Sequence, residues 1–272
     1  MKIGGVISFE ETKFAPVIYK GGFEEGIRKL AEFGYDGVEI SLRDPNTIDK
    51  DKLKKTLKEN KISLASIATG QAALKDGLTF THPDEKIREK AIERIMEQIN
   101  FASEFSVPVI LGLIRGNLPE NEKDREKAFE WTVDACRRCC DFAREKNVTV
   151  CMEIINRYET NWLNTIAEGK KFLESVGKDN LLLHIDTFHM NIEESSLIDS
   201  ILDAEGLIGY VHLVDSNRWA PGYGHIDFKG VLSALKKINY QGFLSLEVFP
   251  LPDPDTAAKK GIEFVRDILK SI

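Results

Sequence analysis

The sequence predicts an α/β protein folded as a single (β/α)8 TIM barrel over residues 1–272. Eight short apolar runs rich in β-branched residues recur along the chain, separated by charged segments with helical periodicity. No linker rich in proline, glycine or serine divides the chain. Eight strand–helix units in about 250 residues favour a closed barrel over a doubly wound sheet. Neither GxGxxG nor GxxxxGK[ST] follows any run, which disfavours dinucleotide and P-loop folds.

The strand candidates are residues 3–9, 36–41, 62–68, 108–113, 148–154, 181–187, 209–215 and 242–248. Amphipathic segments lie between them, at residues 23–34, 51–60, 86–105 and 228–239 among others, and a last one at 255–272 follows the eighth strand. Two boundary signals agree with this alternation. Asp227 is placed as the N-cap of the segment that begins at residue 228, and Gly34 as the glycine that ends the first helix.

Composition excludes several classes of function. The net charge of −7 and the pI of about 5.4 predict no broad basic face, so nucleic acid is disfavoured as a partner. No apolar run approaches membrane-spanning length, and the first residues lack the hydrophobic region of a signal peptide. We therefore expect a cytoplasmic enzyme with no membrane partner.

The four cysteines are Cys136, Cys139, Cys140 and Cys151. The spacing of the first three invites a metal or redox interpretation, but their flanks are helix-periodic. No second cysteine pair or nearby histidine completes a zinc set. We expect buried or half-buried thiols on a packed helix.

Four polar residues stand near the ends of the last four strand candidates: Glu153, Asp186, His212 and Glu247. Each lies in an apolar stretch, where a lone ionised carboxylate would be costly to bury. In a barrel the carboxyl ends of the strands carry the chemistry, so these side chains are expected to converge. Such an oxygen-rich set suits Mn²⁺, Mg²⁺ or Co²⁺. The alternative is that each is an ordinary, satisfied polar residue of a barrel.

Longer motifs carry a resemblance to a known family. The segments EIINRYETNWLNT, DTFHMNIEE, VHLVDSNRWAPGYGHIDF and LSLEVFP resemble the signatures of the ketose 3-epimerases, which include D-tagatose and D-psicose 3-epimerases within the xylose-isomerase-like barrels. The resemblance spans the chain and is densest from residue 150 to 250. In the first half, RDPNTID, the long segment from ATGQAALKDG to IREKAIERI, and LGLIRG are similar to the 5-keto-L-gluconate 3-epimerase branch.

The resemblance implies specific roles. A divalent metal, usually Mn²⁺, would be held by the four strand-end residues, of which Glu153 and Glu247 would also be the acid–base pair. Three further positions would hold the O1–O3 end of the substrate: Glu159, His189 and Arg218. The family also implies a homo-oligomer, a dimer or a tetramer.

This chemistry fits the residue types. Epimerisation at C3 of a 2-ketose removes a weakly acidic proton beside a carbonyl and returns it on the opposite face. A metal on O2 and O3 would take up the charge of the enediolate. Two bases on opposite faces of C3 are then needed, and Glu153 and Glu247 are placed to flank a sugar at the barrel mouth.

Several other residues have open assignments. Arg43 and Arg115 follow strands two and four on the mouth side, where they would bind a substrate carboxylate; a rim salt bridge is the alternative. His184 has the strand parity of Asp186 but lies deeper, so we expect it in the barrel interior. Asp215 is expected to orient His212 or the arginine of its own loop.

The favoured function is therefore metal-dependent C3 epimerisation of a ketose or keto-sugar acid, with 5-keto-L-gluconate to D-tagaturonate the favoured reaction. An aldose–ketose or hydroxypyruvate-type isomerase on the same barrel is the main alternative. A metal-dependent apurinic-site endonuclease is disfavoured by only five histidines and by the negative charge. A non-catalytic sugar-binding barrel would show no turnover.

Overall fold

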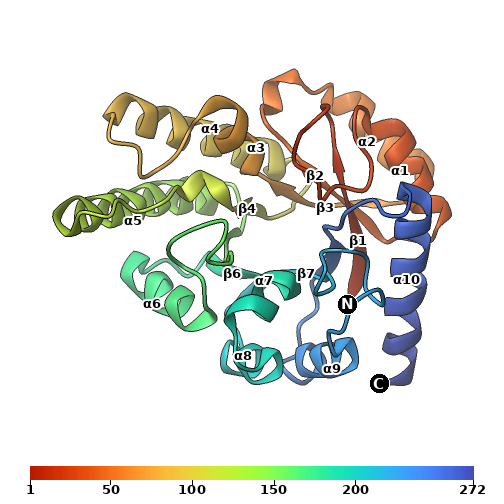
Figure 1. The fold of residues 1–272 in the computed structure, drawn as a ribbon. Coiled ribbons are helices and arrows are strands. Elements are labelled where there is room, and N and C mark those ends of the chain that lie inside the picture. Colours follow the sequence, from red (N-terminus) through yellow and green to blue (C-terminus); the bar gives the residue numbers. More distant parts are fainter.

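A computed structural model describes residues 1–272, and its eight parallel strands close into a barrel in the order β1 to β8 (Figure 1). The strands are β1 Lys2–Ser8, β2 Gly37–Ser41, β3 Ser63–Ala68, β4 Val109–Leu111, β5 Val150–Glu153, β6 Leu181–Asp186, β7 Ile208–His212 and β8 Phe243–Leu246. Each overlaps one of the eight strand candidates. The predicted (β/α)8 barrel is confirmed.

Helices surround the barrel (Figure 1). They are α1 Phe23–Glu32, α2 Lys50–Asn60, α3 Gly70–Asp76, α4 Glu85–Ser103, α5 Glu122–Glu145, α6 Ile166–Val176, α7 Thr187–Glu193, α8 Leu197–Asp203, α9 Phe228–Lys237 and α10 Pro254–Ser271. Two short 3₁₀ turns, Pro45–Thr47 and Leu113–Arg115, follow β2 and β4. No helix has the length and apolar character needed to cross a membrane.

Two helix boundaries are formed by the residues that the sequence predicted for them. The side chain of Asp227 accepts a hydrogen bond from the backbone N–H of Gly230 and caps α9. Gly34 follows α1 with a φ of 89°, a left-handed conformation that glycine adopts without a steric penalty. Both boundary predictions are confirmed.

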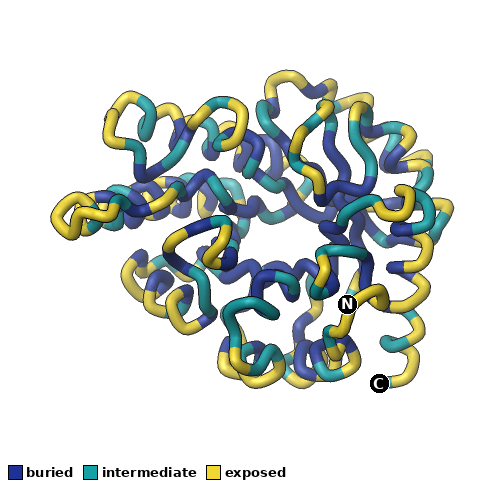
Figure 2. Tube along the Cα trace, viewed as in Figure 1, coloured by how far each residue is buried: buried dark blue, intermediate teal, exposed yellow.

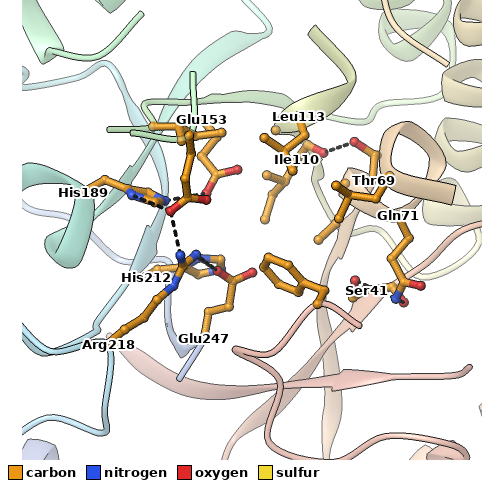
Figure 3. A pocket seen from close by; sticks show the side chains of 17 residues that line it. Ser41, Thr69, Gln71, Ile110, Leu113, Glu153, His189, His212, Arg218 and Glu247 are labelled. Atoms are coloured by element: carbon orange, nitrogen blue, oxygen red, sulfur yellow. Dashed lines mark hydrogen bonds and ion pairs between the residues drawn. The ribbon is translucent and has the colours of Figure 1, made fainter. Parts of the chain in front are cut away.

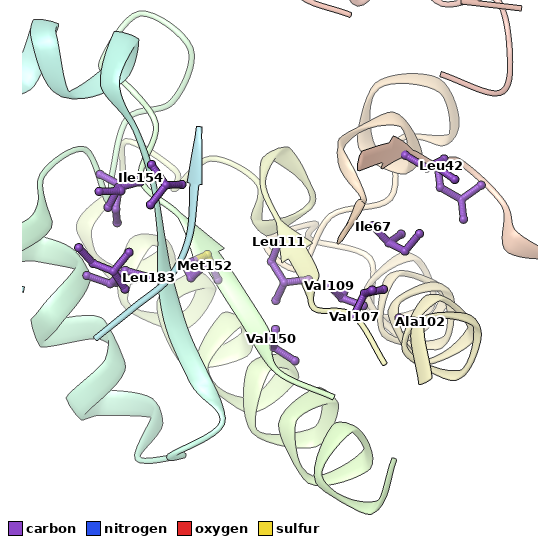
Figure 4. Packing of buried hydrophobic residues seen from close by; sticks show 14 of the residues in the cluster. Leu42, Ile67, Ala102, Val107, Val109, Leu111, Val150, Met152, Ile154 and Leu183 are labelled. Carbon is purple, nitrogen blue, oxygen red and sulfur yellow. The ribbon is translucent and has the colours of Figure 1, made fainter. Parts of the chain in front are cut away.

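Strand alternation divides the interior into two parts. On β4 and β5, Val109, Leu111, Val150 and Met152 point outward into the main core between strands and helices (Figure 4). The residues between them face the other way, and Ile110 packs inside the barrel with the second cluster, which contains Ala65, Cys151 and Tyr210. Figure 2 shows the resulting pattern, with buried strands at the centre and exposed surfaces on the outer helices.

The four cysteines are buried thiols, three on α5 and one on β5. Burial raises the pKa of Cys140 to about 12 and holds the pKa of Cys139 and of Cys151 well above the usual thiol value, which opposes thiolate formation. They belong to the core, as expected.

Candidate active site

The ends of the last four strands meet at the barrel mouth. Glu153, Asp186 and His212 are the final residues of β5, β6 and β7, and Glu247 follows the last residue of β8. Strand pairing places Asp186 directly beside His212. One potential ligand atom from each of the four residues lies within 4.8 Å of those of the other three. The residues proposed from their strand-end positions therefore form one cluster.

The two glutamates of this cluster are buried acids. Burial raises the pKa of Glu153 to about 7, and the nearby Asp186 adds to the rise. Burial also raises the pKa of Glu247 well above its usual value, with Glu153 contributing, although His212 and Arg218 oppose the shift. Each glutamate therefore takes up a proton more readily than an exposed glutamate does, as a proton-transferring group must.

Asp186 and His212 leave two polar atoms without partners. Oδ1 of Asp186 accepts the backbone N–H groups of Phe188 and His189 at the start of α7, at 2.7 and 3.3 Å. Its Oδ2 and the Nδ1 of His212 are buried without a hydrogen bond, 3.5 Å apart. Buried polar atoms rarely lack partners, and these two face the same point as the glutamates. The donor set thus fits a hard divalent cation.

Charge in the cluster is dominated by carboxylates. Burial works against the imidazolium form, but Glu39, Asp186 and Glu247 raise the pKa of His212 well above its usual value. Burial likewise works against ionised Asp186, yet His189, His212 and Arg218 hold its pKa below the usual range. The surplus of negative groups is what a divalent cation would offset.

Glu39 is a member of the site that the sequence analysis missed. It lies in the middle of β2, is fully buried, and its two carboxylate oxygens accept from Nε2 of His212 at 3.1 Å each. The sequence already indicated it: apart from Asp36 at its start, the run DGVEIS has Glu39 as its only acid, set among apolar residues as the later strand-end residues are.

His189 and Glu159 lie together on one side of the cluster. Nε2 of His189 is 3.9 Å from Oε1 of Glu153. The buried side-chain amide of Asn156 lies between the two residues, 2.6 Å from Nδ1 of His189 and 3.1 Å from Oε1 of Glu159. Burial lowers the pKa of His189 to about 4, so the ring is neutral near pH 7.

Arg218 joins two of the acids. Its Nη1 donates to Oε1 of Glu159 at 2.7 Å, and its Nη2 is 3.5 Å from Oε2 of Glu247. The guanidinium lies over the rings of Phe14 and Phe188, at 5.8 and 4.9 Å from their centroids. Arg218 itself has a φ of 62°, an uncommon conformation for a residue with a side chain.

Asp215 holds the loop that carries Arg218. Its Oδ2 accepts the backbone N–H groups of Gly222 and Gly224, at 2.9 and 2.8 Å, and its Oδ1 accepts that of Ser216 at 2.7 Å. The carbonyl of Asp215 also accepts the N–H of Arg218. Asp215 therefore orients the arginine through the backbone, one of the two roles expected for it.

A cavity at the barrel mouth is lined by six of these residues, Glu153, Glu159, His189, His212, Arg218 and Glu247. Figure 3 shows His189 and Arg218 on one side of the cavity and Ser41, Thr69 and Gln71 on the other. Nε2 of Gln71 donates to Oγ of Ser41 at 3.0 Å. The cavity thus has a charged side at the cluster and a neutral polar side opposite.

The two arginines expected to meet a substrate carboxylate do not line this cavity. Arg115 is fully buried: Nη1 donates to the backbone carbonyl of Glu153, and Nη2 donates to Oγ1 of Thr160 and the carbonyl of Trp162, at 2.9 and 3.0 Å. The assignment of Arg115 to substrate binding is wrong, because its 3₁₀ turn directs the side chain beneath the loop after β5.

Arg43 forms a salt bridge on the rim, which was the alternative to binding a substrate carboxylate. Its Nη2 lies 2.6 Å from Oδ1 of Asp76, and the side chain forms an ion pair on the rim. Asp76 is shared with Arg94, whose Nη1 is 3.1 Å from Oδ2. The acidic partner of Arg43 is therefore Asp76 of the protein rather than a substrate carboxylate.

His184 lies in the barrel interior, as expected. It is fully buried, and its ring packs edge-on against that of His212, with centroids 4.1 Å apart. Its Nδ1 is 3.8 Å from Oε1 of Glu153, and neither ring nitrogen has a hydrogen-bond partner.

The closed barrel of eight parallel strands places the chain among the (β/α)8 TIM barrels. Residues 27–268 match the family described as xylose isomerase-like TIM barrel, and the chain belongs to that family.

Curated relatives and solved structures narrow the assignment. The chain is 34% identical to the L-ribulose 3-epimerase of Methylomonas sp. (strain DH-1), over 90% of this chain and 91% of that protein. The crystal structure of a D-allulose 3-epimerase from Methylomonas sp. aligns with a TM-score of 0.84 at 31% identity, covering 98% of each chain. The 3-dehydro-D-guloside 4-epimerase of Escherichia coli (strain K12) is 28% identical over 89% of this chain and 93% of that protein. This chain is therefore an isomerase, a sugar epimerase.

Proposed function

We propose that this epimerase requires a divalent metal ion, with Mn²⁺ the expected ion and Co²⁺ or Mg²⁺ as alternatives, and inverts C3 of a 2-ketose or keto-sugar acid. The observation that carries the proposal is the convergence of Glu153, Asp186, His212 and Glu247, with an unpartnered oxygen and an unpartnered nitrogen facing the same point. These four residues would hold the metal. When bound, such an ion supplies Lewis-acid stabilisation of the negative charge that develops on a deprotonated ketose.

Glu153 and Glu247 are the acid–base pair of the proposed reaction. One carboxylate removes the proton from C3, and the other, as a carboxylic acid, returns a proton to the opposite face. The raised pKa values of both groups suit this exchange, because each group must take up and release a proton during the reaction. The reverse reaction exchanges their roles.

His189 and Arg218 bind the oxygens beside the reacting carbon. Asn156 donates to Nδ1 of His189, so the ring proton is on Nε2, which faces Glu153 and the cavity. Arg218 is the only arginine or lysine that lines the cavity. With Glu159 it holds the O1–O3 end of the sugar, and the Ser41 and Gln71 side receives the other end.

Among acid substrates we favour 5-keto-L-gluconate, converted to D-tagaturonate, on the strength of the motifs in the first half of the chain. Arg43 and Arg115 are not available to its carboxylate. The distal carboxylate would instead meet the neutral polar groups of Ser41, Thr69 and Gln71. The dimer or tetramer expected from the family stays a prediction.

A substrate panel in D₂O tests the proposal. Free ketoses, ketose phosphates and keto-uronates are incubated with the metal-free enzyme, with added Mn²⁺, and with EDTA, and deuterium is located by NMR. Metal-dependent deuterium at C3 is the expected result. Deuterium only at C1 or C2 would instead identify an aldose–ketose isomerase, and full activity in EDTA would refute the metal requirement.

The relative named 3-dehydro-D-guloside 4-epimerase supports one alternative regiochemistry. Its name describes inversion beside a keto group at C3, so the abstracted proton is again adjacent to a carbonyl. Including a 3-keto sugar in the panel separates the two reactions, because deuterium would then appear at C4.

A further inference from the structure

Glu39 is a buried acid with one polar contact. All five residues of β2 are buried, and Glu39 is the only charged residue among them. Its carboxylate meets Nε2 of His212 with both oxygens at 3.1 Å, across 173 positions of sequence and between strands that are not neighbours in the barrel. Burying an acid in a barrel interior costs free energy, and an apolar residue of similar size would avoid this cost. A role in the site explains its presence.

The hydrogen bond fixes which nitrogen of His212 is free. A carboxylate accepts hydrogen bonds, so Nε2 must carry a hydrogen. Nδ1 then faces Oδ2 of Asp186 at 3.5 Å and Oε2 of Glu247 at 3.9 Å, with no hydrogen-bond partner. The nitrogen that Glu39 leaves free is therefore the one aimed at the proposed metal position.

We infer that Glu39 is a positioning residue for the metal site: it holds the ring of His212 and selects the Nε2–H tautomer, so that Nδ1 is the ligand nitrogen. This inference rests on the proposed metal requirement and adds a residue that makes no contact with metal or substrate. Metal-binding histidines are generally oriented in this way by a carboxylate on their other nitrogen, and losing that partner weakens metal binding by about 10- to 100-fold.

The test is calorimetric titration of the metal-free enzyme with Mn²⁺, in the absence of substrate. E39L removes the acceptor, and we expect its Kd to rise by about 10-fold or more. E39Q keeps an acceptor oxygen, so its Kd should lie between those of E39L and the wild type. D76N, which removes a carboxylate from the rim ion pair and none from the cluster, is the matched control and should bind like the wild type.

A second measurement reports on the histidine itself. The chain has only five histidines, so ¹⁵N-labelled imidazole signals in the Mg²⁺-loaded enzyme can be assigned by substitution. We expect the Nε2–H form for His212 in the wild type and in E39Q, the variant that remains informative if E39L does not fold.

The outcomes separate the two proposals. Wild-type Kd values in folded E39L and E39Q, or an Nδ1–H tautomer of His212 in the loaded wild type, would overturn the role of Glu39 while leaving the metal site intact. A wild-type enzyme that binds no divalent ion would overturn the proposed function itself.

Discussion

The side-chain amide of Asn156 lies 2.6 Å from Nδ1 of His189. The amide oxygen accepts the backbone N–H of Tyr158 at 2.9 Å, so the amide nitrogen is the group that faces the histidine. That nitrogen also donates to Oε1 of Glu159 at 3.1 Å. Asn156 thus orients two substrate-side residues and leaves Nε2 of His189 as a hydrogen-bond donor toward the cavity.

Replacing Asn156 tests this orientation. In N156A the ring of His189 loses its partner, and we expect kcat/KM to fall by about 10-fold, equivalent to about 1.4 kcal/mol. N156D should be worse, because a carboxylate favours a hydrogen on Nδ1 and turns Nε2 into an acceptor. Steady-state kinetics measure both changes, with circular dichroism as the check of folding. Wild-type kcat/KM in folded N156D would refute the assigned tautomer.

Glu247→Gln tests the acid–base pair. The amide keeps an oxygen within the cluster but neither removes nor returns a proton. We expect the variant to fold and to keep most of its substrate affinity while kcat falls by about 100-fold or more. Calorimetric binding of substrate and single-turnover kinetics separate the two effects. Near-normal turnover would remove Glu247 from proton transfer.

The order of apolar runs and polar residues along the chain predicted the barrel and most of the residues that cluster at its mouth. Hydrophobic periodicity predicted all eight strands, because each buried strand leaves an apolar run. Strand ends then pointed to the residues that cluster, since parallel strands in a barrel end at one mouth. Glu39 was missed because it lies within its strand rather than at the end, and its partner is far away in sequence.

Arg115 is a residue whose role could not be predicted from its position along the chain. It follows β4 on the mouth side, as a substrate-binding residue would, but it belongs to a short 3₁₀ turn. Periodicity says nothing about the direction of a side chain in such a turn. The carbonyls that accept from Arg115 come from the end of β5 and from the loop after it, and only the folded chain brings them to the arginine.

Arg115 and Arg43 should therefore differ in their effect on stability. Burial lowers the pKa of Arg115 to about 10, and R115M would remove the guanidinium donors from the buried carbonyls of Glu153 and Trp162. We expect the free energy of unfolding to fall by about 2–4 kcal/mol. R43A, which loses a half-exposed ion pair, should cost at most about 1 kcal/mol. Urea unfolding compares them, and equal losses would contradict the assigned environments.

R43A also tests the substrate assignment. Because Arg43 lies on the rim and does not line the cavity, its loss should change KM for a keto-acid and for the matching neutral ketose by the same small factor. Steady-state kinetics of R43A and of the wild type with each substrate measure the two changes in KM. A rise in KM confined to the keto-acid would show that Arg43 reaches the carboxylate after all.

The rim network predicts a pH dependence of stability. Burial alone would raise the pKa of Asp76, but Arg43 and Arg94 outweigh it and hold that pKa below its usual value. A depressed carboxyl pKa stabilises the folded chain above the unfolded pKa of about 3.9, and this contribution disappears as pH falls through the folded pKa. D76N should therefore be less stable than the wild type by about 1 kcal/mol at pH 7 and at pH 5. The difference should shrink steadily below about pH 4. Urea unfolding across this range measures it, and a difference that grows toward acid would mean that Asp76 is not held ionised by the two arginines.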